Sequence, residues 1–122
     1  MPTLRSTLAI ASYALIAGCA APVPTARPLT VDSAAVIQAV HTYRLCAVAA
    51  MLPLESTSRP DSALQVASIA EGQCARELDA VRAAVEQENA SNAYGAVFAQ
   101  GFIEATQKRT VQQLAAGMLK RR

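Results

Sequence analysis

The feature that most constrains the fold is a run of apolar residues at helical spacing in the middle of the chain. Steps of three, one and four residues separate its members, which places them on one face of a helix. They are Ala63, Val66, Ala67, Ala70, Cys74, Leu78, Val81 and Val85. This run predicts a helix from about residue 59 to residue 89.

The charged residues of this segment fall outside the apolar run. Their spacing of three and four residues is typical of a solvated helix surface rather than of a catalytic carboxylate pair. They are Glu71, Arg76, Glu77, Asp79, Arg82 and Glu86.

An earlier segment, from about Val31 to Leu52, also has a helical pattern. Thr30 or Asp32 can cap its start, and Pro53 is expected to end it. Its apolar stripe consists of Val36, Val40, Tyr43, Ala47 and Ala50, with Cys46 beside it.

Residues 54–60, rich in Ser, Thr and Pro, form a break after this helix, and Ser58-x-x-Asp61 resembles a capping box for the next one. A softer break covers residues 89–92. A third helix is expected from 93 to about 119, with a bend at 108–110, where the apolar stripe is interrupted. The predicted fold class is all-α.

The composition allows one small domain with a thin core. Hydrophobic residues make up 52% of the chain but aromatic ones only 4%, and Trp is absent. Alanine-rich helices pack closely and bury little area, so we expect marginal stability unless a cross-link is present. The net charge of +2 is close to neutral and gives no argument for a nucleic-acid partner.

The sequence lacks the residues of common catalytic sites. One histidine, His41, cannot serve a Ser-His-Asp or Cys-His arrangement together with cysteines that are expected to be bridged. The five glycines are scattered and form no phosphate-binding loop. We therefore expect no enzyme and no cofactor, and interpret His41 as a partly covered helix residue.

Near the N-terminus, an uncharged stretch from Ser6 to Gly18 follows Arg5 and ends in Ile16-Ala17-Gly18-Cys19. These last four residues resemble the lipobox of bacterial lipoproteins. The resemblance implies that residues 1–18 are a signal peptide, that Cys19 carries lipid, and that the mature chain is membrane-bound in the bacterial envelope. Ala20, where no Asp follows the cysteine, is similar to lipoproteins released to the outer membrane, facing the periplasm.

Two other interpretations of this segment are an uncleaved membrane anchor and an internal helix that only resembles a signal. Ser6–Leu15 is too short for a bilayer of roughly 30 Å, which needs about 20 apolar residues. Pro22 and Pro24 would also stop a helix soon after Cys19. Residues 19–30 are expected to be an extended, Pro-rich tether, and residues 31–122 the helical domain.

If Cys19 is used by lipid, Cys46 and Cys74 remain as a pair in an oxidising compartment. We expect a disulfide that staples a helical hairpin, with buried free thiols as the alternative. A metal site is a poorer interpretation, because two cysteines and one histidine do not complete a tetrahedral ligand set. With a tight turn the two cysteines would be offset by roughly 13 Å, so the connecting loop must extend. Residues 63–66 would then need cover from the third segment or from a partner.

The largest side chains of the domain gather at the start of the third helix. Tyr94, Phe98 and Phe102 are a candidate interface, which predicts an envelope protein partner or self-association and a structural or interaction role. The alternative for these side chains is that they complete a three-helix core. The alternative function is a small-ligand or lipid-binding module that uses Phe98, Phe102 and Ile103.

Overall fold

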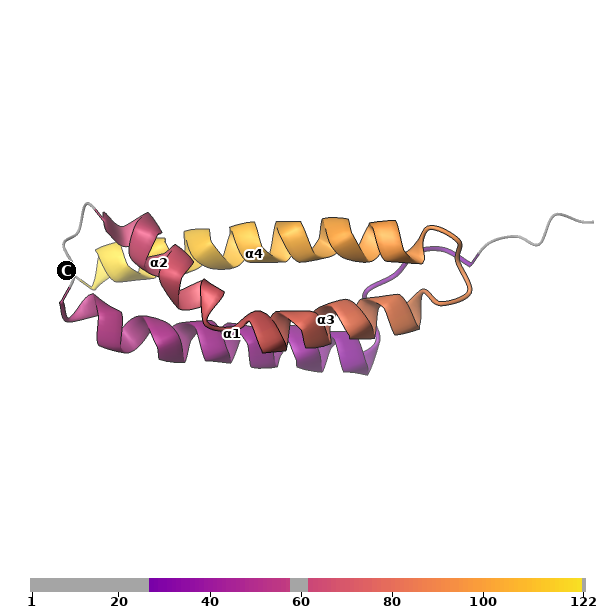
Figure 1. Ribbon diagram of the computed structural model, residues 1–122, viewed down its shortest axis with the longest axis horizontal. Coiled ribbons are helices and arrows are strands. Elements are labelled where there is room, and N and C mark those ends of the chain that lie inside the picture. The colour runs from indigo at the N-terminus through magenta and orange to yellow at the C-terminus, as the bar shows by residue number, and fades with distance from the viewer. Residues whose placement is uncertain (1–26, 58–61, 122) are drawn as a thin grey trace, which may run out of the picture.

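The computed structural model describes residues 27–57 and 62–121, and it is all-α. It has four helices, α1 (Ala34–Glu55), α2 (Ala63–Gly72), α3 (Ala75–Glu88) and α4 (Gly95–Lys120). Figure 1 shows α1 and α4 running the length of an elongated bundle, with α2 and α3 following one another as an interrupted third rod. No strand occurs among these residues.

The two ends of the bundle differ in the chain segments that form them. At the entry end, Asn92 in the turn between α3 and α4 donates a hydrogen bond to the carbonyl of Arg27, where the described chain begins. At the far end, Arg121 pairs with Glu55 at the last residue of α1. The described chain thus enters at one end and finishes at the other (Figure 1).

The start of α1 differs from the prediction, because the helix is capped by Ser33 and not by Thr30 or Asp32. The Ser33 hydroxyl accepts the amide hydrogen of Val36 at 3.2 Å. Thr30 and Asp32 are used otherwise, since the Thr30 hydroxyl and the Asp32 amide both donate to Glu88 of α3. Residues just before α1 are thus joined to the end of α3.

The end of α1 was also predicted wrongly, because the helix continues through Pro53 to Glu55. Proline cannot donate to the carbonyl four residues earlier, which here belongs to Ala49. Ala49 lies on the exposed side of the helix, where water can take over that hydrogen bond. The predicted capping box, Ser58 and Asp61, lies outside the described residues.

The middle segment is two helices rather than the single predicted one. Gln73 and Cys74 separate them, and their amides donate to the carbonyls three residues earlier, at 3.2 and 2.9 Å. Gly72 before the break is a poor helix former. The break leaves the predicted apolar run intact, since all eight of its members are buried.

The prediction that Glu71 belongs to a solvated helix surface is wrong, because this residue is only 9% exposed. Ala67, Glu71 and Cys74 follow one another at steps of four and three, so Glu71 lies on the buried side of the segment. That spacing was the signal available in the sequence.

The third segment is one uninterrupted helix, α4, and the predicted bend at 108–110 is absent from it. The interruption of its apolar stripe arises because two threonines occupy core positions. Thr106 and Thr110 are 7% and 3% exposed, and they continue the buried side from Ile103 to Leu114. The predicted cover for residues 63–66 is confirmed, since Ala63 and Val66 are buried where α2 packs on α4.

Candidate functional site

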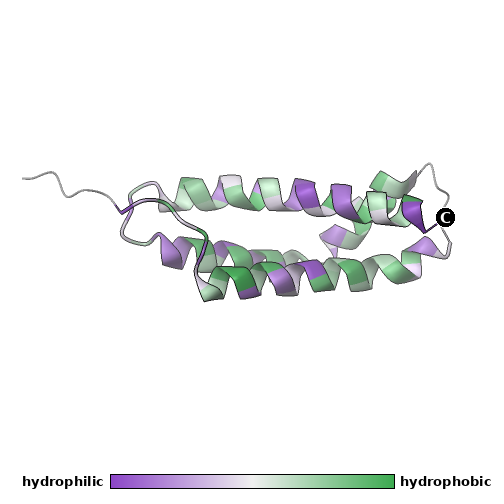
Figure 2. Cartoon of the chain, turned by 180° about the vertical axis from the view of Figure 1, so that it is seen from behind, coloured by the Kyte–Doolittle hydropathy of each residue, from purple (hydrophilic) through white to green (hydrophobic). Residues whose placement is uncertain are grey.

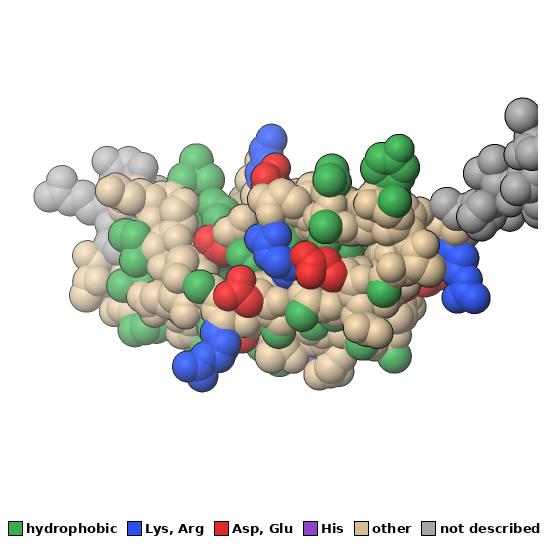
Figure 3. All heavy atoms as spheres, turned by 45° about the vertical axis from the view of Figure 1, so that its right-hand side comes forward, with side chains coloured by type: hydrophobic (Ala, Val, Ile, Leu, Met, Phe, Trp, Pro, Cys, Tyr) green, Lys and Arg blue, Asp and Glu red, His purple; other side chains and the backbone are tan. Residues whose placement is uncertain are grey.

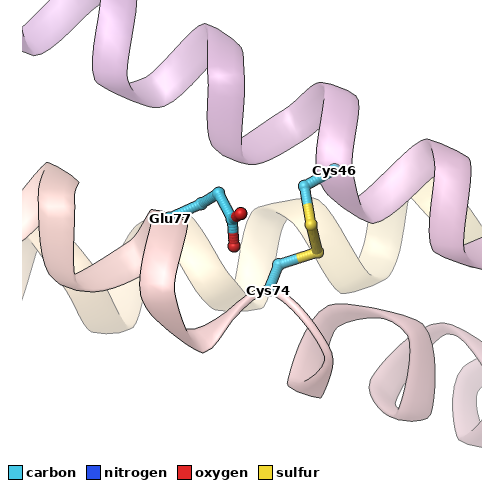
Figure 4. A group of neighbouring side chains, drawn as sticks. All are labelled: Cys46, Cys74 and Glu77. Carbon is cyan, nitrogen blue, oxygen red and sulfur yellow. A yellow bond between two sulfur atoms is a disulfide. The ribbon is translucent and has the colours of Figure 1, made fainter.

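The predicted disulfide is present and links the middle of α1 to the break between α2 and α3. Cys46 and Cys74 are bonded with an S–S distance of 2.05 Å and a Cα–Cα distance of 6.0 Å. Figure 4 shows the carboxylate of Glu77 beside the two sulfurs, and ligand atoms of the three residues lie within 4.8 Å of one another. Because the sulfurs are bonded to each other, they are not thiolates, and this group has no set of metal ligands in its oxidised form.

Next to the disulfide, three helices meet in a buried polar cluster. The Tyr43 hydroxyl of α1 donates to Glu71 Oε1 of α2 at 2.9 Å, and Gln107 Nε2 of α4 donates to the same oxygen at 3.1 Å. Burial and the neighbouring Glu71 raise the pKa of Tyr43 well above its ordinary value, so this phenol stays protonated and acts as a donor. Each helix thereby supplies one member of a directional contact, which specifies how the three rods align.

The entry end is held by a second hydrogen-bond cluster, which we call the clasp. Glu88 Oε1 accepts from the Thr30 hydroxyl, the Asp32 amide and the Ser33 amide at 2.9–3.1 Å. Asn89 exchanges two hydrogen bonds with the backbone of Thr30, at 2.9 and 2.8 Å. Thr30, the last residue of the predicted tether, is thus held against the end of α3 and is part of the folded bundle.

A glycine at the start of α4 makes the clasp compact. A Cβ atom on Gly95 would lie 2.6 Å from the carbonyl oxygen of Asn89, closer than real Cβ contacts. Gly101, by contrast, has nothing within 4 Å of the same position. The close approach of the Asn89 backbone therefore requires glycine at position 95, whereas position 101 has room for a larger residue.

The structure separates the three predicted interface residues. Tyr94 is 71% exposed, whereas Phe98 and Phe102 are half-buried and pack against the core. Ile103 is buried, and Val97 is exposed like Tyr94. The side chains of this segment therefore do not form one open aromatic face, and a partner for them stays a prediction.

The larger exposed apolar surface lies on α1, where sequence reasoning did not place an interface. No charged or polar side chain occurs between Arg44 and Glu55. Leu45, Val48 and Leu52 are 56%, 48% and 58% exposed. We call these three residues the α1 face, and Figure 2 shows this half of α1 green up to its last turn.

A groove between α1 and α4 adjoins the α1 face. It has a volume of about 260 Å³, and Val48 and Leu52 form part of its wall. Its other lining residues are Arg44, Met51, Thr110, Gln113, Leu114, Gly117 and Arg121. His41, which was expected to be partly covered, is exposed on α1 and lines a separate hollow with Val40 and Phe102.

By length and composition alone, α1 meets the criteria for a helix that crosses a membrane, as do many core helices of soluble proteins and many signal sequences. In this bundle, Tyr43, Ala47 and Met51 of α1 are buried against the other helices. Only 22% of its most apolar stretch is buried, however. Much of that apolar surface is therefore available for contact.

Comparison of the chain with protein-family models, with curated proteins and with solved structures found no match. Cys19 lies outside the described residues, so its lipidation stays a prediction.

Proposed function

We propose that the protein is a lipid-anchored lipoprotein of the bacterial cell envelope with a structural or protein-interaction role. The lipobox resemblance at Ile16–Cys19 supports the anchor. The observation that carries the interaction role is the exposed α1 face, which lies in the half of α1 leading away from the entry end. A chain anchored through Cys19 would hold its bundle by the entry end and leave this face accessible to an envelope protein or a second copy.

The anchor is tested by metabolic labelling with palmitate. Wild type should incorporate the label into a membrane-bound form, and Cys19→Ser should lose it. The matched control is Cys46→Ser with Cys74→Ser, which should still be labelled because neither residue follows a lipobox. Label that still enters Cys19→Ser would refute the anchor, and sedimentation of inner and outer membranes would test the proposed outer-membrane location.

The interaction role is tested by site-specific photocrosslinking in intact cells. A crosslinker at Leu52 should give one discrete adduct, at twice the monomer mass if the partner is another copy. The same crosslinker at Ala83, which is exposed on α3, serves as the control. Equal adducts at both positions, or none at Leu52, would contradict a role for the α1 face.

The groove supports a second candidate function, the binding of a small apolar ligand or lipid. Its floor of Met51, Leu114 and Gly117 is mostly apolar, and Arg44 at its margin offers a charge to an acidic group. A fluorescent fatty acid should then bind saturably, and Val48→Trp should abolish binding by filling the groove. Val97→Trp is the control outside the groove, and binding that survives Val48→Trp would exclude this site.

A further inference from the structure

Two exposed apolar side chains mark the entry end. Val97 and Tyr94 are 74% and 71% exposed, the highest values among the large hydrophobic residues that the structure describes. Tyr94 is the residue directly before α4, and Val97 follows it about one helical turn later. Figure 3 shows hydrophobic side chains standing out from the upper edge of the bundle, near the end at which the described chain begins.

The position of Tyr94 is coupled to the point where the chain enters the bundle. Asn92 Nδ2 donates to the carbonyl of Arg27 at 2.7 Å, and the amide of Tyr94 donates to Asn92 Oδ1 at 2.9 Å. A single side chain thus connects the first described residue to the start of α4. Any constraint on the position of Arg27 therefore also applies to Tyr94.

The chain between Cys19 and Arg27 restricts which part of the bundle can reach a membrane. Eight residues span at most about 29 Å when fully extended. The length of α4, 26 residues, corresponds to roughly 39 Å. A lipid on Cys19 therefore allows the entry end to touch the bilayer. The tether is too short for the bundle to stand on its far end, because the entry end would then lie about the length of α4 from the membrane.

We propose that Tyr94 and Val97 rest in the headgroup layer of the membrane that holds Cys19, so that the bundle stands on its entry end. This inference rests on the proposed lipid anchor. Tyrosine suits the interface because its ring is apolar and its hydroxyl remains hydrated. The turn from Asn89 to Tyr94 contains no charged side chain, and Arg27 beside it favours anionic lipid.

The absence of Trp from the chain allows a direct test with single-tryptophan variants. Full-length protein carrying Tyr94→Trp would be reconstituted in vesicles of phosphatidylcholine and phosphatidylglycerol with brominated acyl chains. Its fluorescence should shift to shorter wavelength and be quenched. Leu52→Trp is the matched control, because Leu52 is also an exposed apolar residue but belongs to the α1 face. It should be neither shifted nor quenched.

Each other outcome would overturn the orientation. Quenching at neither position would mean that the bundle stands clear of the bilayer, and equal quenching at both would mean that it lies flat. Quenching of Leu52→Trp alone would reverse the orientation. Adding Val97→Ser to Tyr94→Trp should reduce the quenching, and no reduction would remove Val97 from the contact.

The intact mass of the same preparation separates this inference from the proposed function. A mass without acyl groups would refute the lipid anchor, whatever the fluorescence shows. A mass with acyl groups and no quenching at Tyr94→Trp would leave the anchor standing and refute the membrane contact.

Discussion

The entry end and the far end of the bundle are stabilised by different kinds of contact. At the entry end, Glu88 and Asn89 accept and donate directional hydrogen bonds that tie the incoming chain to α3. At the far end, Arg121 pairs with Glu55, α2 is a helix of ten residues, and the α1 face is apolar and exposed. A thin alanine-rich bundle can thus fix its incoming chain by polar contacts and still leave apolar side chains exposed at both ends.

The disulfide and the polar cluster adjoin the short helix of the far end. Cys74 lies two residues after the end of α2 and Glu71 belongs to α2, so both cross-helix contacts restrain this helix. If these contacts act mainly on the far end, substitutions that remove them should destabilise α2 more than the clasp.

The largest effect is expected from Cys46→Ala combined with Cys74→Ala. Loss of a bridge across 28 residues should lower the free energy of unfolding by about 3.5 kcal/mol in the chain-entropy account. Urea denaturation measures the loss, and hydrogen exchange should accelerate more in α2 than in the turn at 89–94. Equal acceleration at both ends would show that the disulfide does not act mainly on the far end.

Tyr43→Phe should destabilise the bundle by about 1.5–3 kcal/mol, because a buried carboxylate loses a hydrogen bond. The side chain keeps its volume, so the change isolates the hydroxyl from the packing of the ring. Calorimetry of this variant measures the effect. An unchanged melting temperature would mean that Gln107 or water fully replaces the phenol at Glu71.

Gly95→Ala tests the entry end, and should cost about 1–3 kcal/mol because the new Cβ meets the backbone of Asn89. Gly101→Ala is the matched control. It adds a methyl group to open space in the same helix and should stabilise by about 0.5–1 kcal/mol. Urea denaturation of both variants gives the comparison, and the same sign for both would contradict the close approach at Gly95.

The clasp should also make stability depend on pH. Partial desolvation raises the pKa of Glu88, but the hydrogen bonds from Asp32, Thr30 and Ser33 outweigh it and lower the pKa below its ordinary 4.5. Ionised Glu88 therefore stabilises the folded state above the ordinary carboxyl pKa, and this contribution is lost as the pH falls through the lowered value.

Glu88→Gln removes the titrating group, and its difference in melting temperature from wild type should shrink from pH 7 to pH 3. A difference that stays constant over this range would mean that the charge of Glu88 adds nothing to the clasp.

The smallest effect on stability is expected at the α1 face. Leu52→Ser should change the free energy of unfolding by no more than about 0.5 kcal/mol, because the side chain is exposed. It should nevertheless abolish the adduct of a crosslinker placed at Val48. Val97→Ser, a change at a more exposed apolar residue of the entry end, should leave that adduct intact. A large loss of stability in Leu52→Ser would mean that this residue belongs to the core.

Local patterns were sufficient for the helical fold class and for the buried side of the middle segment. All eight apolar residues from Ala63 to Val85 are buried, because a helix turns each residue by a fixed angle and the spacing alone determines which side is apolar. The pairing of Cys46 with Cys74 followed from the lipobox resemblance, which assigns Cys19 to lipid and leaves two of the three cysteines. Neither conclusion needed knowledge of the neighbouring helices.

The helix boundaries and the candidate site depended on contacts between distant residues. Glu88 of α3 binds the backbone directly before α1, and the break at Gln73 interrupts a run whose spacing is unbroken. The burial of Glu71 depends on partners that α1 and α4 supply. Exposure at Tyr94 and burial at Phe98 follow from the helices packed beside α4. Periodicity gives the direction of a side chain from its own helix, but only packing decides whether another element covers it.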